Sequence, residues 1–334
     1  MHQENDSMQD RSNQIWVFRA FAILSVCCAH MPPTEMTQSI DAWCGRILAM
    51  YGTLGVGGFF LCSGYFFDRQ KAVTVEFWKN KLQKLILPWI LMGTLAKMWY
   101  LHIMNMDFRW TEYLTWMIGK GTWLYFIPVL VELLVIFTFV GNRLPILLIL
   151  GACSVISNIA VMRGYGYQSF VTPDMNPLNW AMFFLLGMLW KRQEGTVNTF
   201  LNKWKYVIYV FLAVWSVLYF GAECSVTYWN LYAIPFELAG IFVLMKIAYV
   251  FRNSRALQTI GRNTLFIYIS HMIMAGWVMN HMLSTGIILL LRPIATILIL
   301  YVGIEIVTRG CRWLHLEKIL PYIGMSINRG ETRG

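Results

Sequence analysis

Residues 16–30 read WVFRAFAILSVCCAH, and this first apolar run of the chain decides how the rest is interpreted. It carries Arg19 near its start and His30 at its end, eleven positions apart. At about 100° and about 1.5 Å per residue, eleven steps return to nearly the same helix face, roughly 16 Å farther along the axis. The run therefore predicts a membrane-spanning helix with a cation and an imidazole on one stripe, at two depths.

The composition of the whole chain is that of a membrane protein. Of its 334 residues, 57% are hydrophobic and only 13% are charged, whereas a soluble domain has about 25% charged residues. Aromatic residues make up 16% of the chain, including 15 Trp, and such enrichment suits a protein with two membrane interfaces. We therefore predict an all-α integral membrane protein, a bundle of transmembrane helices.

About ten apolar segments match the roughly 20 residues that a membrane span needs. They are residues 15–31, 47–67, 84–103, 121–141, 144–162, 178–190, 205–222, 229–251, 263–282 and 286–308. The sixth, LNWAMFFLLGMLW, is short. No Gly/Ser-rich linker, low-complexity stretch or convincing repeat divides the chain, so we expect a single transmembrane domain over residues 1–334.

Loop charge gives this bundle a direction. Lys and Arg gather in alternate loops and in the tail: Arg69, Lys71, Lys79, Lys81, Lys84; Lys191, Arg192, Lys203, Lys205; Arg252, Arg255, Arg262; and Arg309, Arg312, Lys318, Arg329, Arg333. Because cytoplasmic loops accumulate these residues, both the polar N-terminus 1–14 and the tail 309–334 should be cytoplasmic. The same rule explains the net charge of +10, so we expect no nucleic-acid partner.

Ionisable residues inside the spans are costly and are candidates for function. They are Arg19, His30, Lys97, Glu132, Glu237, Lys246, His271, Arg292 and Glu305. Lys246 and Arg292 lie near span ends, where long side chains reach the interface. Glu132 and Glu237 lie near mid-span, where each serves either in a structural ion pair or in a site.

Arg19 and His30 have contrasting chemistry. A buried guanidinium needs an anion, which is either a glutamate of the bundle or the phosphate of a bound ligand. Imidazole is the side chain best suited to proton transfer near neutral pH, although His30 is also well placed for an ordinary interfacial histidine. We expect no metal, because the chain has no CxxC and no zinc-finger spacing.

The second span and the basic loop after it contain further candidates. The glycines of GTLGVGGFFLCSGYFF, residues 52–67, favour close helix packing. Ser63 stands at the inner end of this span, next to the basic loop. Lys81 and Lys84 are three apart on one expected helix face. They meet either anionic lipid headgroups or a phosphorylated cytoplasmic cofactor.

These stretches together resemble the membrane-bound acyltransferase-3 family of bacterial surface-sugar O-acyltransferases. FRAFAILSVCCAH is similar to the family's Arg/Lys-x10-His signature, with Arg19 and His30 in the two positions. The other similar stretches are the glycine-rich 52–67, KLQKLILPW at 81–89, GTWLYFIPVLVELL at 121–134 and NTLFIYISHM at 263–272. The chain departs from the pattern where Lys81 and Lys84 replace frequent arginines, and at Trp123-Leu124-Tyr125-Phe126.

The resemblance implies a reaction. Arg19, Ser63, Lys81 and Lys84 would hold cytoplasmic acyl-CoA, in particular acetyl-CoA, and the pantetheine arm would extend outward to His30. His30 would deprotonate a hydroxyl of a cell-envelope glycan or lipid-linked sugar, or would carry the acyl group itself. Glu132 or Glu305 would orient the imidazole. The resemblance also implies a multi-pass protein of the bacterial plasma membrane.

One alternative belongs to a different class. A ten-span transporter or exporter of a small solute or an acylated product would also use intramembrane charges such as Arg19, Glu132 and Glu237. The chain has no inverted repeat and no pair of broken helices to favour that reading. The roles of Glu237, Glu305 and His271 stay open, and a hydrogen-bonded histidine inside the bundle is the simpler interpretation of His271.

Overall fold

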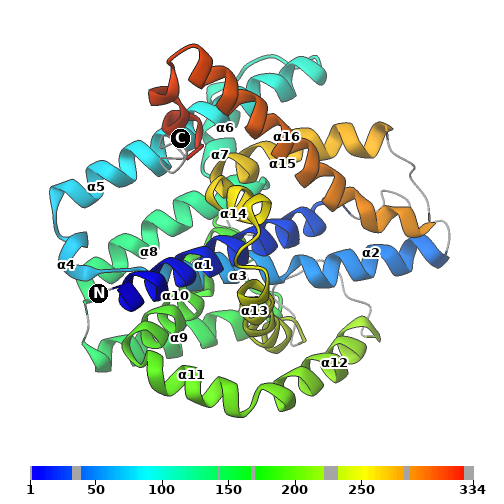
Figure 1. Ribbon diagram of the computed structural model, residues 1–334. Coiled ribbons are helices and arrows are strands. Elements are labelled where there is room, and N and C mark those ends of the chain that lie inside the picture. The colour runs from blue at the N-terminus through cyan, green and yellow to red at the C-terminus, as the bar shows by residue number, and fades with distance from the viewer. Residues whose placement is uncertain are drawn as a thin grey trace. The chain divides into compact units, whose positions relative to one another are not determined.

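A computed structural model describes residues 2–31, 39–141, 143–166, 170–221, 232–281 and 286–326, without the side chains of 2–9, 39 and 280. All regular structure in these ranges is helical, as Figure 1 shows, and no strand is present in them. The predicted all-α fold is therefore confirmed. Each of the ten expected apolar segments contains a helix, and residues 144–162 form α9 (Leu144–Met162) with the predicted ends.

Six helical stretches of the described chain are long and apolar enough to cross a membrane: Asp10–Ala29, Ile40–Tyr65, Trp123–Val140, Leu144–Met162, Ala233–Val250 and Gly286–Trp313. A seventh exists if Glu194–Lys203 and Lys205–Gly221, which are bent by 67°, count as one span. The segments expected at 84–103 and 178–190 form helices of only 17 and 16 residues. Sixteen residues reach about 24 Å, less than the roughly 30 Å hydrocarbon core.

The chain divides into two compact units. Unit 1 comprises Met1–Gly52, Asn80–Met106 and Leu244–Gly334, and unit 2 comprises Thr53–Lys79 and Asp107–Val243. Two helices run across these limits, α5 (Val75–Lys81) and α13 (Ala233–Val250).

Unit 1 is built around the long first helix. Its elements are α1 (His2–Ala29), α2 (Ser39–Gly52), η1 (Leu82–Ile86), α6 (Leu87–Ile103), α14 (Arg255–Arg262), α15 (Thr264–His281), η4 (Gly286–Leu291), α16 (Arg292–Trp313) and η5 (Glu317–Ile323). Helix α1 packs against α2, α14, α15 and α16. At Gly261 a Cβ would lie 1.7 Å from the Trp16 carbonyl oxygen. Helix α14 therefore lies directly on the backbone of α1, close to Arg19.

Unit 2 contains the glycine-rich helix. Its elements are α3 (Leu54–Tyr65), α4 (Arg69–Ala72), α7 (Trp110–Met117), η2 (Trp123–Tyr125), α8 (Phe126–Val140), α9, η3 (Pro173–Met175), α10 (Pro177–Arg192), α11 (Glu194–Lys203) and α12 (Lys205–Gly221). Helices α3 and α10 approach backbone to backbone. A Cβ on Gly64 would lie 1.9 Å from the Phe184 carbonyl oxygen, and one on Gly187 would lie 2.0 Å from that of Leu61. The sequence favoured packing for most glycines of residues 52–67 and set Ser63-Gly64 apart as a candidate site, whereas the structure shows Gly64 in a close helix contact.

A polar network joins α9 to α10 inside unit 2. The amide of Asn158 donates to the Ser154 and Asn179 carbonyls at 2.8 and 3.0 Å. The hydroxyl of Ser154 donates to the Leu178 carbonyl at 2.5 Å, and Asn179 donates to the Pro173 carbonyl at 2.9 Å. Interhelical hydrogen bonds of this kind hold membrane helices together, so we assign these buried amides to structure.

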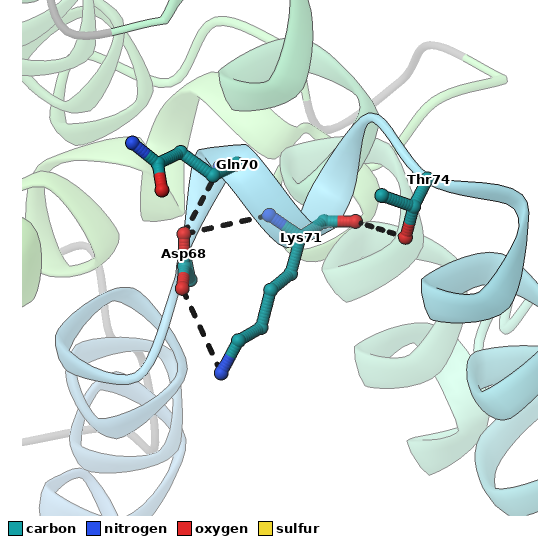
Figure 2. Close-up of polar contacts among 4 residues, drawn as sticks. All are labelled: Asp68, Gln70, Lys71 and Thr74. Carbon is teal, nitrogen blue, oxygen red and sulfur yellow. Dashed lines mark hydrogen bonds and ion pairs between the residues drawn. The ribbon is translucent and has the colours of Figure 1, made fainter.

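The basic loop after α3 begins with a capped turn, shown in Figure 2. The Asp68 carboxylate accepts from the backbone N–H groups of Gln70 and Lys71 at 2.9 and 3.4 Å, which satisfies donors at the start of α4. Its other oxygen lies 3.7 Å from the Lys71 ammonium, and the Thr74 hydroxyl donates to the Lys71 carbonyl at 2.7 Å. Lys71 is thus engaged locally, within its own turn.

Candidate active site

Arg19 lies in the second half of α1 and is held there by residues of α1 and α15. Its guanidinium donates to the Thr264 hydroxyl at 2.5 Å and lies 5.1 Å from the centre of the Trp16 ring. Thr264 is the first residue of α15 and is buried, and its hydroxyl donates in turn to the Gly261 carbonyl at 3.3 Å. The guanidinium is therefore fixed beside the N-terminus of α15, where helix backbone N–H groups favour an anion.

Lys81 brings a second positive charge to this place. Burial lowers the pKa of the Lys81 amine from its usual value, and the nearby charge of Arg19 lowers it as well. Lys81 directly precedes the π-helical turn η1, which ends just before Pro88. Single π turns inside helices occur often at functional sites. Lys81 and Arg19 are near enough for their two positive charges to influence each other.

Lys84 differs from Lys81 in its surroundings. Lys81 is half-buried, whereas Lys84 is exposed. The expectation of one common face assumed an ordinary α-helix, but Lys84 lies within the π-helical turn that begins directly after Lys81. Pro88 accounts for this turn, because it has no N–H and its ring would meet the carbonyl four residues earlier in an α-helix. A wider turn relieves that contact.

His30 follows the last residue of α1, and its backbone N–H donates to the Cys27 carbonyl at 3.2 Å. Helix α2 closes on this end of α1, because a Cβ on Gly52 would lie 2.6 Å from the backbone N and Cα of Ala29. Nearby, the Ser25 hydroxyl donates to the Tyr51 carbonyl at 2.5 Å. The position of the imidazole therefore depends on the contact between α1 and α2.

The ring of His271 faces that of His30, with 5.2 Å between the ring centres and an angle of 47° between the planes. His271 is fully buried in α15, and its Nδ1 lies 2.6 Å from the Tyr268 carbonyl oxygen. The sequence marked His271 as an intramembrane histidine but contained no sign that it would meet His30. Only the packing of α15 against α1 brings the two rings together.

Ser63 and Glu132 belong to unit 2, whereas Arg19, Lys81 and His30 belong to unit 1. The Ser63 hydroxyl donates to the Phe59 carbonyl of its own helix at 2.8 Å. Glu132 is an exposed residue of α8, and no hydrogen bond or ion pair of its carboxylate is formed with the described residues.

Glu237 and Glu305 have local partners. Glu237 is buried in unit 2, and its Oε1 accepts from the backbone N–H of Gly57 at 3.0 Å, in the first turns of α3. This contact explains a carboxyl group at mid-span, because an unsatisfied backbone N–H inside a membrane is costly. Glu305 lies 3.8 Å from Arg309 on α16.

Taken together, the helices and their composition define a multi-pass membrane protein. No group of three or more His, Cys, Asp or Glu side chains that would hold a metal ion is found among the described residues. Comparison with known proteins gives the family: a family model described as the acyltransferase domain of acyltransferase 3 matches residues 13–308. The chain belongs to this family and is a membrane acyltransferase. No curated protein and no solved structure matches it.

Proposed function

We propose that this protein is an O-acyltransferase that moves an acetyl group from acetyl-CoA to a hydroxyl group of a cell-envelope glycan or lipid-linked sugar. The donor binds on the predicted cytoplasmic side and the acceptor on the opposite side of a bacterial plasma membrane. The observation that supports the proposal is the arrangement along α1, with the positive charges of Arg19 and Lys81 toward one end and the paired rings of His30 and His271 at the other.

The donor end suits the phosphates of CoA. Arg19 and Lys81 supply two positive charges, and the N-terminus of α15 beside Thr264 adds backbone dipoles of the same sign. A guanidinium binds phosphate with two parallel hydrogen bonds, and an ammonium binds it as a point charge. In this proposal, the exposed Lys84 makes a further contact with the nucleotide part of CoA, whereas the contact of Ser63, in unit 2, rests on the resemblance alone.

The acceptor end suits proton transfer. Eleven residues of helix separate Arg19 from His30, roughly 16 Å along the axis, and the extended pantetheine arm of CoA has a comparable length. An acyl thioester bound through its phosphates at Arg19 would thus present its carbonyl near His30. His30 then acts as general base for the attacking hydroxyl, or accepts the acyl group itself. Glu132 belongs to unit 2, and its role in orienting this imidazole rests on the resemblance to the acyltransferase-3 family alone.

The transporter alternative has lost much of its basis. It used intramembrane charges for ion coupling, and one of them, the Glu237 carboxyl group, is engaged by the Gly57 N–H. The family match names an acyltransferase, and we therefore keep the enzyme as the one proposal.

The test is acetyl transfer from radiolabelled acetyl-CoA to an acceptor glycan in membranes that contain the protein. His30→Ala should lower the rate of transfer by about 10²- to 10⁴-fold, while His102→Ala, at an exposed histidine in the last turn of α6, should retain it. Transfer at the wild-type rate by His30→Ala would overturn the mechanism, and a protein that leaves acetyl-CoA intact with every acceptor would overturn the function.

A further inference from the structure

His30 and His271 are close enough for one ring to determine the tautomer of the other by a hydrogen bond. A hydrogen bond between facing ring nitrogens, about 3 Å long, leaves the two ring centres about 5 Å apart. The observed separation of 5.2 Å agrees with this value. No hydrogen bond of the His271 Nε2 is formed among the described residues, so the hydrogen bond inferred below requires one ring to rotate from the tilted arrangement of 47°.

The tautomer of His271 follows from its own helix. Its Nδ1 lies 2.6 Å from the Tyr268 carbonyl oxygen, which can only accept, so Nδ1 carries the proton. The Nε2 of a neutral His271 is then a hydrogen-bond acceptor. Because His271 is fully buried, bulk water cannot move the proton from Nδ1 to Nε2.

From these contacts we infer that His271 is a positioning residue for His30, and that its Nε2 accepts the N–H of the His30 ring. The inference rests on the proposed function. A donor nitrogen on His30 that is bound to His271 leaves the other His30 nitrogen with its lone pair, which is the form that a general base needs. The second histidine therefore plays the part that a carboxylate has in a Ser-His-Asp triad.

The reaction balances through this pair. The acceptor hydroxyl gives its proton to the free nitrogen of His30 while its oxygen forms a bond to the acyl carbon. The C–S bond of the thioester breaks, and sulfur leaves with the electron pair as a thiolate. The thiolate takes the proton from the His30 imidazolium, which restores neutral His30. Throughout these steps the other N–H of His30 stays on His271, which stabilises the positive charge as it develops.

The experiment compares three substitutions at His271 in the full-length protein. His271→Asn keeps a donor at the place of Nδ1 for the Tyr268 carbonyl but has nothing at the place of Nε2. His271→Gln carries an amide oxygen that reaches the place of Nε2, and His271→Leu supplies neither group. We expect kcat to fall about a hundredfold in His271→Asn and His271→Leu, with KM for both substrates unchanged, and to fall less than tenfold in His271→Gln.

A matched control lies ten residues farther along the same helix. The Nδ1 of His281 lies 2.9 Å from the Trp277 carbonyl oxygen, so it repeats the local contact, but His281 is exposed. His281→Leu should leave kcat unchanged. A purely structural role of His271 predicts instead that His271→Asn, which preserves the local contact, is as active as the wild type, and this result would overturn the inference.

A second measurement separates failure of the inference from failure of the proposed function. In a His30→Ala background, His271→Leu should cause no further loss, because a residue that acts only through His30 has nothing left to act on. A further loss of tenfold or more would overturn the positioning role while leaving His30 as the base. If His30→Ala by itself keeps the wild-type rate, the proposed function fails first.

Discussion

Lys81 is the residue whose ionisation should be visible in the kinetics. Burial and the charge of Arg19 lower its pKa, so the amine loses its proton at a lower pH than an ordinary lysine. Only the protonated amine attracts phosphate, and KM for acetyl-CoA should therefore rise as the pH is raised through this pKa. One charged hydrogen bond is worth about 1.5–3 kcal/mol, which limits the rise to roughly ten- to hundredfold.

Steady-state kinetics across an alkaline pH series measures this effect. Lys81→Arg keeps its charge at every accessible pH and should give a flat KM, whereas the rise should persist in Lys84→Arg, because Lys84 is exposed. A flat profile in the wild type would contradict the assignment of Lys81 to the phosphate site.

Glu237 provides a second prediction, this time about stability. Its carboxyl oxygen accepts the N–H of Gly57, and Glu237→Gln keeps an oxygen that can do the same. Glu237→Leu leaves that N–H unsatisfied and should cost about 1–3 kcal/mol, seen as a lower melting temperature in detergent. The glutamine variant should melt and transfer acetyl groups almost as the wild type does. Loss of all activity in Glu237→Gln, with stability intact, would show that the ionisable proton itself is needed.

Sequence reasoning reached some of these residues and missed others for a physical reason. The Arg19–His30 spacing is a property of one helix, so it could be read directly from the chain. The partners Thr264 and His271 lie more than 240 positions away from Arg19 and His30. Their contacts depend on how α15 packs, which no local pattern encodes. The sequence did not predict that Glu237 accepts a hydrogen bond from the Gly57 N–H, because that contact depends on where α3 begins.

At the scale of elements, the contact between α1 and α2 controls the position of His30. Gly52→Ala would place a Cβ 2.6 Å from the Ala29 backbone, where the neighbouring helix has no flexible side chain to move. Overpacking of this kind costs about 1–3 kcal/mol, and the shift of the end of α1 should lower kcat more than it changes KM for acetyl-CoA.

Gly276→Ala is the matched control for Gly52→Ala. Gly276 lies inside α15, and a Cβ there would meet nothing within 4 Å. Its replacement should be neutral or slightly stabilising, by up to about 1 kcal/mol, because alanine favours helix more than glycine does. The test compares kcat and melting temperature for Gly52→Ala and Gly276→Ala. Equal values for the two variants would show that the contact between α1 and α2 does not constrain His30.

Apolar runs in the sequence predicted the presence of helices but not every break within them. Apolar runs predicted the helices well, since hydrophobic length is what a membrane selects. They did not reveal the π turn at 82–86 or the end of α2 at Gly52, directly before α3. Both features depend on backbone hydrogen bonds and on helix contacts, and a hydrophobic run looks the same with or without them.

At the scale of the whole molecule, loop charge predicts that the loops around α11 and around Arg163 lie on opposite sides of the membrane. Thr196→Cys and Tyr165→Cys would place thiols at exposed residues of these two loops. In intact cells a membrane-impermeant maleimide should label the second and not the first, with the unmodified chain as background. The reverse labelling pattern would invert the bundle and place the CoA site on the outside.

The most direct measurement of the central claim uses the purified protein in sealed vesicles, with radiolabelled acetyl-CoA on one side and a trapped hydroxyl acceptor on the other. Arg19 lies inside α1 and His30 directly follows its last residue, so we predict that the acetyl group reaches the trapped acceptor while CoA stays on the donor side. His30→Ala vesicles should show no such product. Acetylation only when donor and acceptor share a compartment would contradict the account.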